Sequence, residues 1–101
     1  MVQAGRGLTL EDLRARREEI LRIAAAHGAR NVRIFGSVAR GEAGPDSDID
    51  FLVEMEPGRS VLDLSELILD LKETLGQDID VVEIRRPSKL AERIRREAIP
   101  L

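Results

Sequence analysis

The most constraining part of this chain is the run from Gly36 to Val53, where a glycine-serine turn leads into alternating acidic and apolar residues. Apolar residues at positions 49, 51 and 53 predict a β-strand over residues 48–54, because successive side chains of a strand point to opposite faces. Asp48 and Asp50 then project from the same face, with their Cα atoms roughly 6.5–7 Å apart. Two neighbouring carboxylates repel each other, so this face indicates a site for a cation or a shared proton.

The bulk composition predicts one globular domain. The chain has 101 residues, of which 43% are hydrophobic and 35% charged, as is typical of soluble domains. We expect residues 1–8 to form a flexible tail and residues 9–101 to form the domain. The sequence contains neither an apolar run near the ~20 residues that span a bilayer nor a start resembling a signal peptide. A cytoplasmic location without membrane contact is the expectation. The absence of cysteine excludes disulfides and thiolate metal sites.

The net charge of −3 conceals an uneven distribution. Residues 41–83 hold thirteen acidic and two basic residues, whereas the segments on both sides carry an excess of basic residues. An acidic middle with basic ends suits a metal site that has a phosphate or an acidic partner nearby. The alternative is that the helices simply carry charges on their solvated faces.

Periodicity and turn residues predict the element order α-β-(α)-β-α-β-α. This order favours an α/β (α+β) fold, with a small mixed sheet and helices packed mainly on one face. The expected elements are a helix from Thr9 to Gly28, a strand over 31–35, a short helical turn from Ser37, a strand over 48–54, a helix from Ser60 to Gly76, a strand over 78–84 and a helix opening at Pro87-Ser88.

Helical spacing also predicts which sides of the two later helices are buried. Leu62 and Leu69 fall outside the buried stripe and lie seven residues apart on one line, so we expect a contact patch for another subunit. This expectation implies a homo- or hetero-oligomer; the alternative is two scattered exposed leucines. The residues expected to be buried are Val61, Leu64, Leu67, Ile68, Leu71 and Leu75 in the first helix, and Leu90, Ile94 and Ala98 in the second.

Three common motifs do not fit the acidic run. A P-loop needs a lysine and a Ser or Thr where this chain has Glu42 and Ala43. An EF-hand needs glycine at its sixth position and glutamate at its twelfth, where Phe51 and Pro57 stand. The single histidine, His27, has no ligand partner at zinc spacing, and its place at a helix end favours a capping interaction.

Asp80 is the best candidate for a third carboxylate. It lies in the middle of an expected strand between two apolar residues, where an acid has no packing reason to be. If this strand neighbours the strand over 48–54, Asp80 can join Asp48 and Asp50. Carboxylates about 5 Å apart repel by about 3 kcal/mol per pair at an effective dielectric near 20. Oxygen ligands of this kind favour Mg²⁺ or Mn²⁺. The alternatives are that Asp80 is only a strand-edge residue, or that Asp78 is the third acid.

Taken together, these motifs resemble a known superfamily. Gly-Ser-x-Ala-Arg-Gly at 36–41, Ser-Asp-x-Asp at 47–50 and a later strand aspartate are similar to the DNA polymerase β-like nucleotidyltransferases. Within that superfamily, the small size of the chain and the sequence of residues 36–41 resemble the minimal nucleotidyltransferases, the MNT-domain antitoxins that are paired with HEPN toxins. The resemblance implies a polymerase β-like nucleotidyltransferase core.

The resemblance also implies roles for individual residues. Gly36 and Ser37 would hold the triphosphate of the nucleotide at a helix start, where the dipole favours anions. Asp48 and Asp50 would bind two divalent ions, and Asp80 would complete the shell of one ion and help to deprotonate the incoming hydroxyl.

Two further residues keep open roles. Arg40 would pair with phosphate oxygens, or alternatively form an ion pair with Glu42 or Asp46. Ser47 would either bond the nucleotide or cap the start of the strand.

The implied function is transfer of AMP from ATP to a hydroxyl, a tyrosine of a partner HEPN toxin, with the chain acting as antitoxin. The alternative is a non-catalytic antitoxin that neutralises its toxin by binding alone. Direct nucleic-acid binding is disfavoured, because the chain has no Tyr or Trp and only two Phe to stack on bases.

Overall fold

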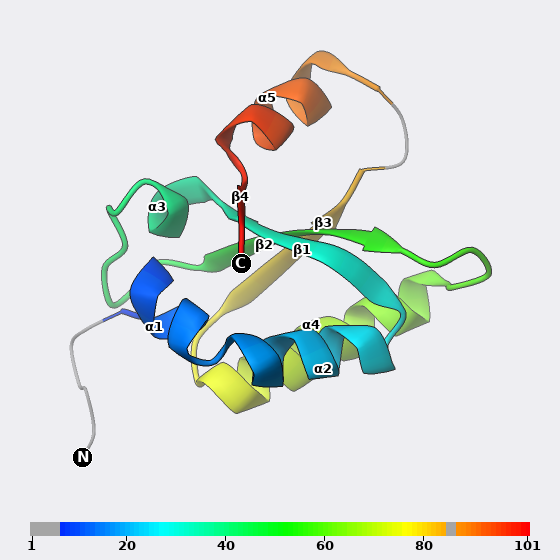
Figure 1. Ribbon diagram of the computed structural model, residues 1–101, viewed down its shortest axis with the longest axis horizontal. Coiled ribbons are helices and arrows are strands. Elements are labelled where there is room, and N and C mark those ends of the chain that lie inside the picture. Colours follow the sequence, from blue (N-terminus) through cyan, green and yellow to red (C-terminus); the bar gives the residue numbers. More distant parts are fainter. Residues whose placement is uncertain (1–6, 85–86) are drawn as a thin grey trace.

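A four-stranded mixed sheet, in the order β3-β2-β1-β4, forms the centre of the computed structural model, which describes residues 7–84 and 87–101 (Figure 1). The helices and strands follow the predicted order, and a short strand is added at the end. The elements are α1 (Leu10–Ala15), α2 (Arg17–Ala26), β1 (Ala29–Phe35), α3 (Gly36–Ala39), β2 (Ile49–Met55), α4 (Val61–Leu75), β3 (Ile79–Glu83), α5 (Lys89–Glu97) and β4 (Ile99–Pro100).

The strand pairing brings distant parts of the sequence together. β1 and β2 are antiparallel, with Phe35 opposite Asp50. β2 and β3 are parallel and are joined through α4, with Asp50 opposite Asp80. The condition on which the choice of Asp80 depended, that these two strands are neighbours, is therefore met. β4 pairs antiparallel with β1 over only two residues, which is too short to produce a period in the sequence.

Most helices cover one face of the sheet, as predicted. Figure 1 shows α1, α2 and α4 together on one side of the strands and α5 on the other side. The core lies between the sheet and the first group of helices. Its fully buried members include Leu13, Ile20, Ile34, Phe51 and Leu67. The opposite face, on the side of α5, carries polar side chains such as Asp50 together with the buried Leu52.

The predicted helix starts are confirmed, because they depend on local hydrogen bonds. Thr9 and Asp12 form a capping box at α1, and Ser60 and Asp63 form another at α4. Gly76 ends α4 in the left-handed conformation, with a φ of 67°. The expected single helix up to Gly28 is instead divided into α1 and α2 by the non-helical residue between them.

Two predictions about buried residues are wrong. Val61 is 71% exposed, because it is the first residue of α4 and full burial begins only at Leu67. Leu90 is 66% exposed, and its neighbour Ala91 is buried instead. Ile94 and Ala98 are partly buried, so only the first of the three positions predicted to face inward in α5 is misplaced. Leu62 and Leu69 are 74% and 64% exposed, so their predicted place outside the core is confirmed.

The prediction of a flexible tail over residues 1–8 is wrong at its last two residues. Gly7 is buried, and the Leu8 N–H donates a hydrogen bond to Gln77 Oε1 at 3.0 Å. These two residues belong to the folded domain, and the rest of the predicted tail lies outside the described residues. No helix in the described parts of the chain combines the length and apolar character required to cross a membrane.

Candidate active site

The strand register places two of the three predicted acids side by side. Asp50 in β2 lies opposite Asp80 in the parallel strand β3, so both side chains leave the same face of the sheet. This face is opposite the core, because Ile49 and Phe51 on either side of Asp50 are fully buried. Asp48 directly precedes β2 and is exposed. The fold thus joins carboxylates that are thirty residues apart in the sequence.

The surroundings of Asp50 raise the pKa of its carboxyl group. Partial burial raises the pKa of this carboxyl group above its ordinary value, and the negative charges of Asp80 and then Asp48 raise it further. The positive charge of Arg40 acts in the opposite direction and lowers it. A bound cation would relieve the repulsion among these carboxylates.

The donor chemistry of these residues fits Mg²⁺ or Mn²⁺, because carboxylate oxygens are the ligands that both ions prefer. Within residues 7–84 and 87–101, however, no three His, Cys, Asp or Glu side chains form a group arranged to hold a metal ion. Asp50 and Asp80 are paired, whereas Asp48 lies beside them without completing such a group. The convergence of all three acids on bound ions stays a prediction.

Gly36 is the residue that allows the turn and the acids to approach closely. It begins α3 with a φ of +74°, a conformation that favours glycine. A Cβ atom at this position would overlap the Asp50 carboxylate at a separation that real Cβ atoms essentially never show. The first N–H groups of a helix lack an acceptor within the helix, so the N–H groups of Gly36 and Ser37 at the start of α3 are candidates for binding an anion.

Arg40 forms an ion pair with Glu42, which was the predicted alternative to phosphate binding. Its Nε donates to Glu42 Oε1 at 3.0 Å, and its Nη1 contacts Glu97 Oε1 of α5 at 3.4 Å. The hydrogen bond to Glu42 is the main cause of its raised pKa. The alternative partner Asp46 does not take part. The contact with Glu97 had no signal in the sequence, because it depends on where α5 returns to the sheet.

Ser47 organises the loop before β2. Its hydroxyl accepts the Gly44 N–H at 2.9 Å, and its carbonyl accepts Gln77 Nε2 at 2.7 Å. This geometry matches the predicted role at the start of the strand. Gln77, which sequence reasoning missed, ties this loop to Leu8 through the same side chain. His27 is the C-cap residue of α2, as predicted. Its Nε2 also lies 2.7 Å from Asp70 Oδ2 of α4, a contact that the sequence did not predict.

Comparison with known proteins gives a consistent result. The family model described as "Nucleotidyltransferase domain" matches residues 17–100. Protein adenylyltransferase MntA of Thermococcus cleftensis is 38% identical over 91 residues, which are 81% of this chain and 92% of that protein. A solved structure provisionally identified as a minimal nucleotidyltransferase is 54% identical, with a TM-score of 0.83, and the match covers 93% of this chain and 97% of the other.

A more distant structure shares the fold. It contains a tri-AMPylated HEPN toxin of Shewanella oneidensis in complex with its MNT antitoxin. The matched chain is 20% identical, with a TM-score of 0.65 and coverage of 86% of this chain and 69% of the other. At this identity the likeness concerns the fold alone.

Proposed function

This chain belongs to the nucleotidyltransferase domain family, and we propose that it transfers AMP from ATP to a hydroxyl of a partner HEPN toxin, a tyrosine, and so acts as an antitoxin. The observation that carries the proposal is the Asp50–Asp80 pair beside the glycine turn at Gly36. The name of the Thermococcus relative and the toxin complex with the same fold support it. We also propose that the protein acts in the cytoplasm.

The chemistry assigns a role to each residue. Bound Mg²⁺ or Mn²⁺, two ions in this proposal, would stabilise negative charge on the attacking and leaving oxygens. Asp48 and Asp50 would hold the ions, Asp80 would contribute a further carboxylate ligand, and the Asp80 carboxylate accepts the proton of the acceptor hydroxyl. A bond forms between the acceptor oxygen and the α-phosphorus of ATP, the bond from that phosphorus to the bridging oxygen breaks, and pyrophosphate leaves.

The glycine turn and Arg40 serve the phosphate groups. The backbone N–H groups at Gly36 and Ser37 bind the β- and γ-phosphate oxygens at the start of α3. Arg40 exchanges its contacts with Glu42 and Glu97 for phosphate oxygens when ATP is present. The half-exposed position of the Arg40 side chain supports this exchange, because exposed ion pairs contribute little stability.

A second candidate is an antitoxin that neutralises its toxin by binding alone. The observation in its favour is the exposure of Leu62 and Leu69 on α4, which suits a protein contact. In this case the acids would be dispensable for neutralisation.

One experiment separates the two candidates. The chain is incubated with α-labelled ATP, Mg²⁺ and the protein encoded by the neighbouring gene, and label on that protein is measured. We expect transfer by the wild type and by Asp46→Asn, an acid of the same loop outside the site. Asp48→Asn and Asp80→Asn should each lose transfer at least about 100-fold, because catalysis depends on the geometry of the site. Full neutralisation by Asp48→Asn without label on the partner would refute the enzymatic proposal in favour of binding.

A further inference from the structure

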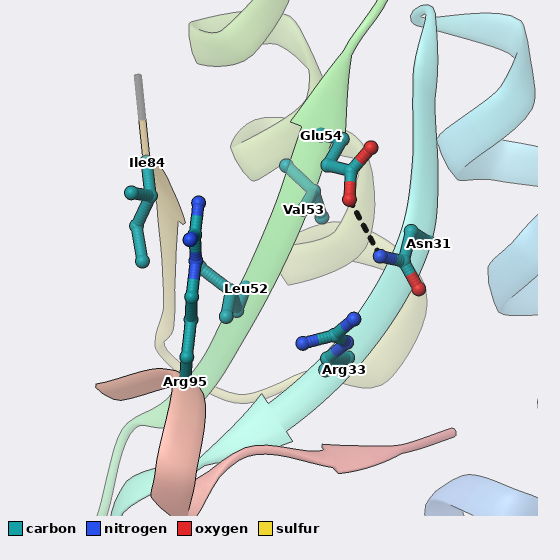
Figure 2. A pocket seen from close by; sticks show the side chains of 7 residues that line it. All are labelled: Asn31, Arg33, Leu52, Val53, Glu54, Ile84 and Arg95. Carbon is teal, nitrogen blue, oxygen red and sulfur yellow. Dashed lines mark hydrogen bonds between the residues drawn. The ribbon is translucent and has the colours of Figure 1, made fainter. Parts of the chain in front are cut away.

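A cavity of about 280 Å³ lies between β1, β2, α5 and Ile84, the residue after β3 (Figure 2). Figure 2 shows the Arg95 side chain extending from α5 between Ile84 and Leu52, while Arg33 of β1 reaches into the same space. Leu52 is 5% exposed, although it is not part of the main cluster of buried residues. The cavity therefore has an apolar floor and two guanidinium groups at its sides.

Among the residues that the structure describes, the two guanidinium groups find no partner. In the described part of the chain, neither Arg33 nor Arg95 forms a hydrogen bond or an ion pair. The nearby Glu54 is bonded instead by Asn31, whose Nδ2 donates to its Oε2 at 2.6 Å. Two unpaired cations beside an apolar floor favour a ligand that carries negative charge and some apolar surface.

The cavity begins next to the acids. Leu52 follows Asp50 by two residues in β2, so both side chains leave the same face about 6.5–7 Å apart. Across the antiparallel pair, Phe35 lies opposite Asp50 and Arg33 lies opposite Leu52. Along β1, the cavity therefore lies beside Arg33, Asp50 lies beside Phe35, and the glycine turn of α3 follows at Gly36.

This order matters for an in-line displacement. The acceptor oxygen must approach the α-phosphorus from the side opposite the leaving pyrophosphate. In the proposed function the pyrophosphate lies over α3, at one side of Asp50 and Asp80. The cavity lies at the other side, where the acceptor would approach.

We propose that this cavity binds an acidic segment of the acceptor protein, whose carboxylates pair with Arg33 and Arg95 and whose hydroxyl-bearing residue reaches Asp50 and Asp80. This inference rests on the proposed function. A nucleoside is the rival occupant, but adenine is uncharged and would leave both guanidinium groups unneutralised. Aspartate or glutamate side chains would neutralise both groups through charge-assisted hydrogen bonds.

The test uses two synthetic fluorescent peptides and the full chain. One peptide has a tyrosine flanked by two glutamates on each side, and the matched peptide has glutamine at those four positions. Binding is followed by fluorescence anisotropy. The variants are Arg33→Gln and Arg95→Gln, and the control is Arg96→Gln, an exposed arginine of the same helix. Binding of ATP with Mg²⁺ to each variant is measured by calorimetry.

We expect the wild type to bind the acidic peptide about fivefold more tightly than its neutral match, as partly exposed ion pairs allow. Arg33→Gln and Arg95→Gln should each lower this preference, whereas Arg96→Gln should keep it. Affinity for ATP should be unchanged in all three variants, which also shows that they are folded. Equal binding of the two peptides by the wild type overturns the inference, as does an equal loss in Arg96→Gln. Weakened ATP binding with an intact peptide preference assigns the cavity to the nucleoside and overturns it as well.

The same data separate this inference from the proposed function. A peptide preference that depends on Arg33 and Arg95, without AMP transfer to the partner, supports the acidic-segment site and refutes the transferase. AMP transfer that both variants leave intact, together with no peptide preference, supports the transferase and refutes the acidic-segment site.

Discussion

Replacing Gly36 by alanine should separate catalysis from stability, because the methyl group would meet a carboxylate of the site. Gly36 and Gly41 share a φ of +74°, so alanine suffers the same backbone strain at either position. That strain amounts to roughly 1–2 kcal/mol for a left-handed alanine. The Cβ at Gly41 has no atom within 4 Å, whereas the Cβ at Gly36 overlaps Asp50 Oδ2. Gly41→Ala is therefore a matched control.

The two variants should differ mainly in activity. The Asp50 carboxylate must retreat by more than 1 Å to reach an ordinary contact with the new methyl group. Since the end of a side chain can rotate, this movement adds little to the loss of stability. A misplacement of about 1 Å in a catalytic group can lower the rate on the order of 100-fold. We expect both variants to unfold at similar denaturant concentrations, and only Gly36→Ala to lose AMP transfer.

Chemical denaturation and transfer of labelled AMP measure the two effects on the same preparations. The reasoning would be refuted if both variants kept equal activity, because Asp50 would then not depend on the space left by Gly36. A much larger loss of stability in Gly36→Ala than in Gly41→Ala would also contradict it, since the carboxylate would then be held too rigidly to move.

Three further predictions concern the protonation of Asp50, the cap of α4 and the exposed leucines of α4. The pKa of Asp50 is raised in the folded protein, so without metal its ionisation lowers the free energy of unfolding. This loss is absent below the ordinary carboxyl pKa and complete above the raised pKa. Asp50→Asn should therefore melt at a higher temperature than the wild type in EDTA near neutral pH, and Mg²⁺ should stabilise only the wild type; equal melting in EDTA would contradict this. Ser60→Ala should lower the free energy of unfolding by about 1 kcal/mol, through loss of the cap of α4, and an unchanged denaturation midpoint would argue against the cap. The double variant Leu62→Ser, Leu69→Ser should sediment as free monomer under conditions where the wild type is associated, and identical sedimentation would exclude this patch as the contact.

The sequence predicted best those features that depend on neighbouring residues. The capping boxes at Thr9 and Ser60 and the left-handed end at Gly76 need only three or four consecutive residues. Asp80 was identifiable because an acid in the middle of an apolar strand has no packing role. Its alignment with Asp50 depended on the strand order, which the helix between the two strands indicated.

The parts that could not be predicted depend on how α5 returns across the sheet. Leu90 and Ala91 both lie within one helical turn of Ile94, so the sequence alone cannot decide which of them faces the protein. The contact between Arg40 and Glu97 joins residues from α3 and α5 that no local pattern links. Arg33 and Arg95 meet at one cavity for the same reason.

The position of Asp80 on β3 has a consequence for how this protein can lose activity. β3 is the outermost strand at its end of the sheet, and it is bonded to β2 on one side only. Opening of this single ladder would separate Asp80 from Asp50 while the antiparallel β1–β2 pair and the residues packed beneath it remained in place. Catalytic activity would then be lost well before global unfolding, and faster hydrogen exchange of the β3 amides would be the earliest sign of that loss.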